Sequence, residues 1–242
     1  NGCMIWGGSL GMVPADSKII HIEKQLKIDP EAQLLASIMS KKLAVGSKYI
    51  VIDIPYGKSA KVTKKKALKL KKKFEAIAKH FNRKMKVVLV PGNEPMGTGV
   101  GPALELKDVV DVLNLSKQGP EDLENKATML SGILLELTKK AKKGQGQKLA
   151  RETISSGKAF EKFKQIIDAQ EGDSKKVDKI KNAKFKRDIF AKKGGKVIEI
   201  DNKKINAMAR VAGCPKDKYA GLKINISLKE KIKKKQKLLT IY

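Results

Sequence analysis

Residues 48–55 read KYIVIDIP and residues 85–90 read MKVVLV. Both runs are short, apolar and rich in β-branched residues, which is typical of buried strands. Between them, Thr63 is placed to cap a helix that extends to about Asn82 and repeats its apolar residues at helical spacing. A strand, a helix and a second strand in this order predict an α/β fold with a parallel sheet and helical cover.

Two loops follow the predicted strands, at residues 56–62 and at the glycine-rich residues 91–102. In open α/β sheets, ligands bind beyond the carboxyl ends of the strands, so we expect these loops to form the rims of a site. Before this unit, residues 29–46 predict a helix with Asp29 as its cap, Pro30 in its first turn and Gly46 as its left-handed stop. Further helices are predicted at residues 103–113, 120–143 and 145–170.

The polar stretch at residues 171–176 is the best candidate for a domain boundary. Beyond it the pattern predicts a small α+β domain. Its expected elements are strands at 185–191 and 196–200 joined through Lys192–Gly195, a helix capped by Asp201 and ending at Gly213, and strands near 221–227 and 237–242. The opening residues 4–8 also resemble a strand. Since both ends of the chain look cut within an element, we expect a fragment of a longer protein, with parts at 1–46, 47–172 and 173–242.

The chain has 242 residues with 53 Lys+Arg against 25 Asp+Glu, which gives a formal net charge of +28. Such a charge invites the hypothesis of a nucleic-acid-binding module. However, only four of the basic residues are arginine, the residue best suited to forked contacts with phosphates and bases, and aromatics are 5% of the chain. A solvated coat of lysine is therefore favoured, and a lysine-rich nucleic-acid-binding module is kept as the alternative.

The sequence contains no apolar run approaching the length of a membrane span, and residues 1–9 do not resemble a secretory signal. Two cysteines, Cys3 and Cys214, are too few for a disulfide framework or a cysteine-rich zinc site. We therefore expect a cytoplasmic protein without a membrane partner, a metal or a cofactor.

The spacing Gly97-x-Gly99-x-Gly101 suggests a loop that cradles phosphate, because it follows a strand and precedes a helix. It matches neither the dinucleotide fingerprint nor the P-loop. The alternative is a tight loop that brings its backbone close to a neighbouring helix.

Ser37 and Lys41 lie four residues apart, so they share one face of the predicted helix. Lys41 is either a cation that stabilises the helix C-terminus, or it acts with Ser37 to donate hydrogen bonds to a planar ligand. His21, in the polar stretch before this helix, is also able to donate to a ligand. A lone histidine without cysteine or carboxylate neighbours does not predict a metal site.

Several segments in order carry a resemblance to a known family. These are WGGS at 6–9, PADSKIIHIE at 14–23, DPE at 29–31, ASIMSKK at 36–42, VIDIPYG at 51–57, the loop 92–105, GCPKDK at 213–218 and LTIY at 239–242. The chain resembles the thymidine/pyrimidine-nucleoside phosphorylase family over nearly its whole length, and within it the archaeal AMP phosphorylases.

This resemblance implies a pentosyltransferase that cleaves the N-glycosidic bond of a nucleoside 5′-monophosphate such as AMP, or of a pyrimidine nucleoside. Inorganic phosphate is the co-substrate, and the products are the free base and ribose 1,5-bisphosphate or a pentose 1-phosphate. The implied fold is of the nucleoside phosphorylase class II type. It has a helical base-binding part, a central mixed sheet with helical cover, and a C-terminal domain of the pyrimidine nucleoside phosphorylase type.

The resemblance also assigns roles to residues. Ser37 and Lys41 match family positions that contact the nucleobase, and His21 stands where the family has an arginine. Ser17 falls at a substrate-contacting position, and Asp16 is the nearest carboxylate for the proton donor. Donors placed in this way would stabilise negative charge as it develops on the departing base.

In the family, phosphate is held by a glycine-rich Lys/Ser loop that lies upstream of the segment seen here. The resemblance thus implies that this chain carries the base side of the site without the phosphate side, and that it is inactive alone. A split enzyme with its other half on a separate chain is a further alternative. The full-length family members also imply a homo-oligomer.

Overall fold

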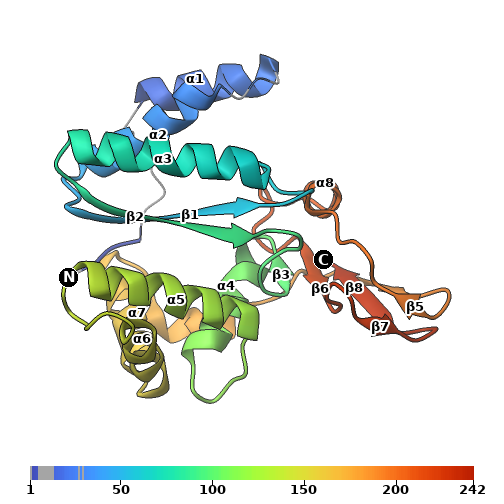
Figure 1. The fold of residues 1–242 in the computed structure, drawn as a ribbon. Coiled ribbons are helices and arrows are strands. Elements are labelled where there is room, and N and C mark those ends of the chain that lie inside the picture. Colours follow the sequence, from blue (N-terminus) through green and yellow to red (C-terminus); the bar gives the residue numbers. More distant parts are fainter. Residues whose placement is uncertain (1, 5–13, 27, 29) are drawn as a thin grey trace.

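The computed structural model describes residues 2–4, 14–26, 28 and 30–242. Strands β1 (Tyr49–Tyr56) and β2 (Lys84–Pro91) form a two-stranded parallel sheet, in register from Tyr49 opposite Lys84 to Tyr56 opposite Pro91. Helix α3 (Lys64–His80) covers one face of this sheet, and α5 (Glu121–Leu137) covers the other (Figure 1). The predicted strand–helix–strand unit is therefore confirmed, and the hydroxyl of Thr63 caps α3 by accepting from the amide of Lys66.

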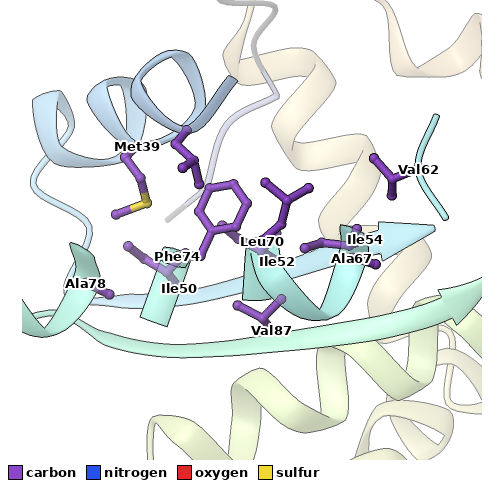
Figure 2. Packing of buried hydrophobic residues seen from close by; sticks show 11 residues of the cluster. Met39, Ile50, Ile52, Ile54, Val62, Ala67, Leu70, Phe74, Ala78 and Val87 are labelled. Atoms are coloured by element: carbon purple, nitrogen blue, oxygen red, sulfur yellow. The ribbon is translucent and has the colours of Figure 1, made fainter. Parts of the chain in front are cut away.

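The main core lies between α3, the sheet and α2 (Glu31–Ala44), as Figure 2 shows. Phe74 and Leu70 of α3 are almost fully buried. They pack with Ile50 and Ile52 of β1 and with Met39 of α2. Because α2 buries its apolar side in this core, its polar side is left to face α1 (Pro14–Leu26), the helix stacked above it (Figure 1).

Helix α1 was not predicted from the sequence, although Pro14 at its start and Asp16 in its first turn are typical of a helix N-terminus. Helix α2 agrees with the prediction, and Gly46 has the expected left-handed backbone with φ +67°. The proposed cap Asp29 and most of the strand proposed at residues 4–8 lie outside the described residues. Helix α5 ends before residue 143, since Lys139 adopts a left-handed φ of +61° just after the helix.

Further helices pack together on the other side of the sheet (Figure 1), and a 3-10 turn contacts two of them. Their bounds are α4 Pro102–Leu113, α6 Gly146–Ser155, α7 Lys158–Ala169 and η1 Ser174–Lys179. A second core cluster joins Val110 of α4, Phe160 of α7 and Val177 of η1. This cluster fixes the segment around residue 177 against α4.

A four-stranded antiparallel sheet has the order β3-β6-β8-β4. Its strands are β3 Gly99–Val100, β6 Leu222–Ile224, β8 Lys237–Ile241 and β4 Arg187–Phe190. Strand β3 arises within the predicted loop 91–102 and joins this sheet through β6. The sheet therefore links the middle of the chain to residues 187–241, while the predicted domain boundaries stay a prediction.

The predicted strand at 185–191 is confirmed as β4, whereas the predicted strand at 196–200 is wrong beyond Lys196. Strand β4 pairs with β8, where the hydroxyl of Thr240 donates to Asp188 at 2.6 Å. Strand β5 is only Gly195–Lys196 and pairs with β7 (Lys231–Ile232) in a protruding ribbon (Figure 1). The apolar pattern misled the prediction, because Ile198 is 88% exposed and packs in no core. Helix α8 (Asn202–Val211) agrees with the prediction and has Asp201 as its cap.

Within the described part of the chain, no helix is both long enough and apolar enough to cross a membrane.

Candidate active site

The residues predicted to form a site come from two stacked helices. Asp16, Ser17 and His21 lie on α1, and Ser37 and Lys41 lie on α2. The structure brings three of them together. The carboxylate Oδ2 of Asp16 accepts from Lys41 Nζ at 2.6 Å and from Ser37 Oγ at 3.0 Å.

Ser17 and His21 are exposed on α1, away from this cluster. The ring of His21 contacts the Gln25 side chain, with 2.9 Å between His21 Nε2 and Gln25 Nε2. Among the described residues, these two share α1 with Asp16 but make no hydrogen bond to Ser37 or Lys41.

Gln33 is a fourth member of the cluster that the sequence interpretation missed. Its Nε2 donates to Asp16 Oδ1 at 3.2 Å. Gln33, Ser37 and Lys41 follow one another at intervals of four residues, so they form one polar face of α2. Extending the Ser37–Lys41 spacing back by one turn would have found Gln33.

The Lys41 ammonium makes three hydrogen bonds. Besides Asp16, it donates to the carbonyl oxygen of Ser37 at 3.1 Å and to Ser37 Oγ at 3.0 Å. A lysine ammonium has three N–H donors, and the cluster uses all three. The Asp16 side chain is 9% exposed and the Lys41 side chain 32% exposed, so the pair is partly shielded from water.

The electrostatics favour the charged form of Asp16. Burial alone would raise the pKa of this carboxyl, but hydrogen bonds from Lys41, Ser37 and Gln33 and the charge of Lys41 outweigh it and lower the pKa. At the next position, burial lowers the pKa of Lys42, and the charge of Lys41 adds to that effect. Asp16 is thus a carboxylate near neutral pH in this arrangement, and its role as proton donor stays a prediction.

A cavity of about 300 Å³ lies beside the cluster. Ser37 and Gln33 of α2 line it together with Lys61, which belongs to the loop after β1. A second cavity, of about 550 Å³, lies at the carboxyl ends of β1 and β2. Both predicted rim loops line the second cavity, and Lys61 lines both cavities.

The glycine-rich loop holds carboxylates of its own chain. The amides of Thr98 and Gly99 donate to Asp108 Oδ2 at 2.6 and 2.7 Å, and the amide of Gly97 donates to Asp122 at 2.9 Å. Gly99 also lies so close to the backbone of Leu104 that it has no room for a Cβ. Of the two interpretations of this loop, the structure favours close packing over a phosphate cradle.

The fold and the site together define an α/β protein in which a lysine, a serine and a carboxylate from two helices form a hydrogen-bonded cluster, and the serine also lines a neighbouring cavity. Comparison with known proteins gives the particular relatives. The chain is 46% identical to the AMP phosphorylase of Pyrococcus horikoshii over 242 residues, 47% to that of Pyrococcus abyssi, and 45% to that of Methanococcus maripaludis strain S2 over 243 residues. No family model matches the chain.

These alignments cover 99–100% of this chain but 48% of each relative. The chain spans about half the length of the curated relatives it matches. It is therefore a homologue of the C-terminal part of archaeal AMP phosphorylases, and the resemblance inferred from the sequence is confirmed.

Proposed function

We propose that this chain supplies the nucleobase side of the active site of a nucleoside 5′-monophosphate phosphorylase. In the proposed reaction, an oxygen of inorganic phosphate bonds to C1′ of the ribose as the bond from C1′ to the base nitrogen breaks. The electron pair of that bond leaves with the base, which takes up a proton. With AMP as substrate, the products are adenine and ribose 1,5-bisphosphate.

The Asp16–Ser37–Lys41 cluster beside its cavity carries this proposal. Negative charge develops on the departing base, and an ammonium with a hydroxyl at that place stabilises it. Because all three N–H donors of Lys41 are in use, a bound base must replace one of them. The bonds to Ser37 are 3.1 and 3.0 Å long, against 2.6 Å for the bond to Asp16, so a bond to Ser37 is exchanged first.

A second exchange, of the bonds that Lys41 and Ser37 make to Asp16, gives Asp16 a role. While Lys41 and Ser37 bind Asp16, its pKa is lowered and it holds no proton. A base that draws these donors away removes the interactions that lower the pKa and leaves the opposing effect of burial. Asp16 would then take up a proton and be able to pass it to the departing base, as a general acid requires.

The proposal leaves the phosphate side to the half of the relatives that this chain does not match. The glycine-rich loop is a poor candidate for that task, since its amides already bind Asp108 and Asp122.

We further propose that copies of the chain associate through the outer face of α1. Ile19, Ile22 and Leu26 follow a helical spacing there and are 42%, 53% and 62% exposed.

The test measures AMP binding to the 242-residue chain by calorimetry, in the wild type and in Lys41→Met. We expect Lys41→Met to weaken AMP binding by about tenfold, the equivalent of one charge-assisted hydrogen bond. Lys42→Met is the matched control, because it removes the same charge one position away without touching Asp16. Equal affinity of all three proteins would contradict the proposed role of Lys41.

A second experiment tests the reaction. The chain is co-expressed with the N-terminal half of the Pyrococcus horikoshii relative, and the release of adenine from AMP and phosphate is followed. We expect release from the paired halves and none from either half alone. Adenine release by the 242-residue chain alone would overturn the division of the site between the two halves.

A further inference from the structure

A hollow of about 630 Å³ lies far along the chain from the proposed active site, and the charged residues among the described ones that line it are all lysines. It forms where the start of α4, the turn η1 and the loop before β6 meet. Lys176, Lys179, Lys181 and Lys218 line it beside Tyr219. Its volume is within the range of roughly 300–1,000 Å³ that is typical of small-molecule sites.

The local structure explains why these lysines point to one place. In a 3-10 helix, side chains three residues apart lie above one another, which places Lys176 and Lys179 of η1 on the same side. Val177 is buried in the second core cluster and Ile180 packs against it. The lysines of this segment therefore project from an anchored backbone.

The opposite wall is also fixed. The amide of Ala103 in α4 donates to the carbonyl oxygen of Lys218 at 3.0 Å. Gly101 approaches the carbonyl oxygen of Ala220 so closely that it has no room for a Cβ. The loop that carries Lys218 and Tyr219 is thus held against α4.

The charge of this hollow sets it apart from four other hollows on the described part of the chain. Those four each have at least one carboxylate in their walls, namely Asp178, Glu94, Glu124 and Glu23. Among the described residues that line the lysine-lined hollow there is no carboxylate. The nearby Asp173 pairs with Lys176 at 3.0 Å, and Asp217 accepts from the amide of Tyr219 at 2.8 Å.

Tyr219 adds an aromatic surface to this cationic wall. It is 48% exposed, and its hydroxyl makes no hydrogen bond with the described residues. Exposed aromatic rings next to basic residues stack nucleobases while the cations hold phosphates. Lys176 is already paired with Asp173, but the three other ammonium groups still exceed the charge of one phosphate, about −1.5 to −2 near neutral pH, so several phosphates match them better.

We propose that the lysine-lined hollow binds a free nucleoside polyphosphate, with its base on the Tyr219 ring and its phosphates on the surrounding lysines. This site is separate from the Asp16–Ser37–Lys41 cluster and takes no part in the proposed cleavage. The concentration of a nucleoside triphosphate would then regulate the protein through a site outside the active site.

Calorimetry with ATP in magnesium-free buffer tests this site on the 242-residue chain. We expect one ATP per chain in Lys41→Met, in which binding at the proposed base site is weakened. Tyr219→Leu and the double variant Lys179→Gln/Lys218→Gln should each weaken ATP binding about tenfold, the equivalent of one lost stacking contact or charged contact. The control Lys72→Gln/Lys79→Gln removes two exposed lysines from α3 and the same net charge, and should leave the affinity unchanged.

Amide shifts in NMR spectra then locate the ligand, and we expect them at residues 176–181 and 217–221. In Lys41→Met, ATP binding should persist even if AMP binding is lost, which separates this site from the proposed active site. Equal weakening in the α3 control, or shifts elsewhere, would overturn the proposal. The proposal would also be overturned if tripolyphosphate bound as tightly as ATP and Tyr219→Leu did not change the ATP affinity. Tighter binding of an RNA oligomer than of ATP would overturn it as well.

Discussion

Lys41 uses every N–H bond that its ammonium group offers. This saturation makes the cluster stable without a ligand and also poised for exchange, because any incoming acceptor has to displace an existing one. The hydrogen bonds to Ser37 are internal to α2, so their loss leaves the link between α1 and α2 through Asp16 in place. The two helices can therefore stay joined through Asp16 during this first exchange.

The lowered pKa of Asp16 predicts a specific pH dependence of stability. Its folded pKa lies below the ordinary value of 3.8, so the stabilisation is present above that value and is lost as the pH falls through the lowered one. We expect the Tm of the wild type to fall more steeply than that of Asp16→Asn when the pH drops below 3.8. The exposed Glu171→Gln is the control. Parallel pH profiles for the wild type and Asp16→Asn would contradict the lowered pKa.

At the residue scale, the sequence predicts what lies within one helix and not what lies between helices. Ser37 and Lys41 are correctly placed on one face, because the helical repeat determines it. The contact of Asp16 with both depends on how α1 packs on α2, and no local pattern encodes that packing. Ser17 and His21 follow Asp16 by one and five residues on α1, so the helical repeat places them on other sides of that helix.

Strand β3 is held in its sheet by close backbone approaches. Gly101, the residue after β3, has a φ of +123°, and a Cβ at this position would collide with the carbonyl oxygen of Ala220. Only glycine meets both conditions without strain. The joint between the β3–α4 turn and the loop before β6 therefore depends on this one position.

The substitution Gly101→Ala tests the joint. We expect it to lower the free energy of unfolding by about 2–3 kcal/mol, since it adds both a steric overlap and an unfavourable φ. Gly195→Ala is the matched control, because a Cβ there meets nothing within 4 Å. Urea denaturation measures both, and a loss below 0.5 kcal/mol for Gly101→Ala, on the scale of surface substitutions, would show that the joint relaxes easily.

The outer face of α1 makes a prediction about association. If Ile19, Ile22 and Leu26 pack against a second copy, a charge at the centre of this stripe should separate the copies. We expect Ile22→Lys to shift the sedimentation coefficient toward that of a monomer. Leu115→Lys, at a residue 61% exposed on another part of the chain, should leave it unchanged. A wild type that sediments as a monomer at every concentration would rule out this interface.

At the element scale, long periodic segments were predictable and short strands were not. The helices α3 and α4 and the parallel pair β1–β2 follow from apolar spacing and caps. Strands β3, β5 and β7 have two residues each, so their pairing is decided by distant partners rather than by their own sequence. Helix α1 was missed because most of its large apolar residues, Ile19, Ile22 and Leu26, are exposed instead of marking a buried side.

The net charge of +28 sets a property of the whole molecule. Self-repulsion of like charges destabilises a compact state, and salt screens it within a Debye length of about 10 Å at 0.1 M. We therefore expect Tm to rise between 0.05 and about 0.5 M sodium chloride. The variant Lys72→Glu/Lys79→Glu should show a smaller rise, because it lowers the net charge by four. A Tm that falls with salt would indicate that ion pairs dominate over repulsion.

The pairing of strands in the sheet β3-β6-β8-β4 determines the order in which the chain can fold during its synthesis. Val100 pairs with Leu222, and Leu222 in turn pairs with Ile241. While the ribosome is still making the residues in between, β3 has no partner, although the β1–α3–β2 unit already has its own core. We therefore expect the β1–α3–β2 unit to fold early during synthesis. Strand β3 and its glycine-rich loop stay unpaired until β6 and β8 have been made. During that interval, an unpaired strand edge is exposed to chaperones and to other nascent chains.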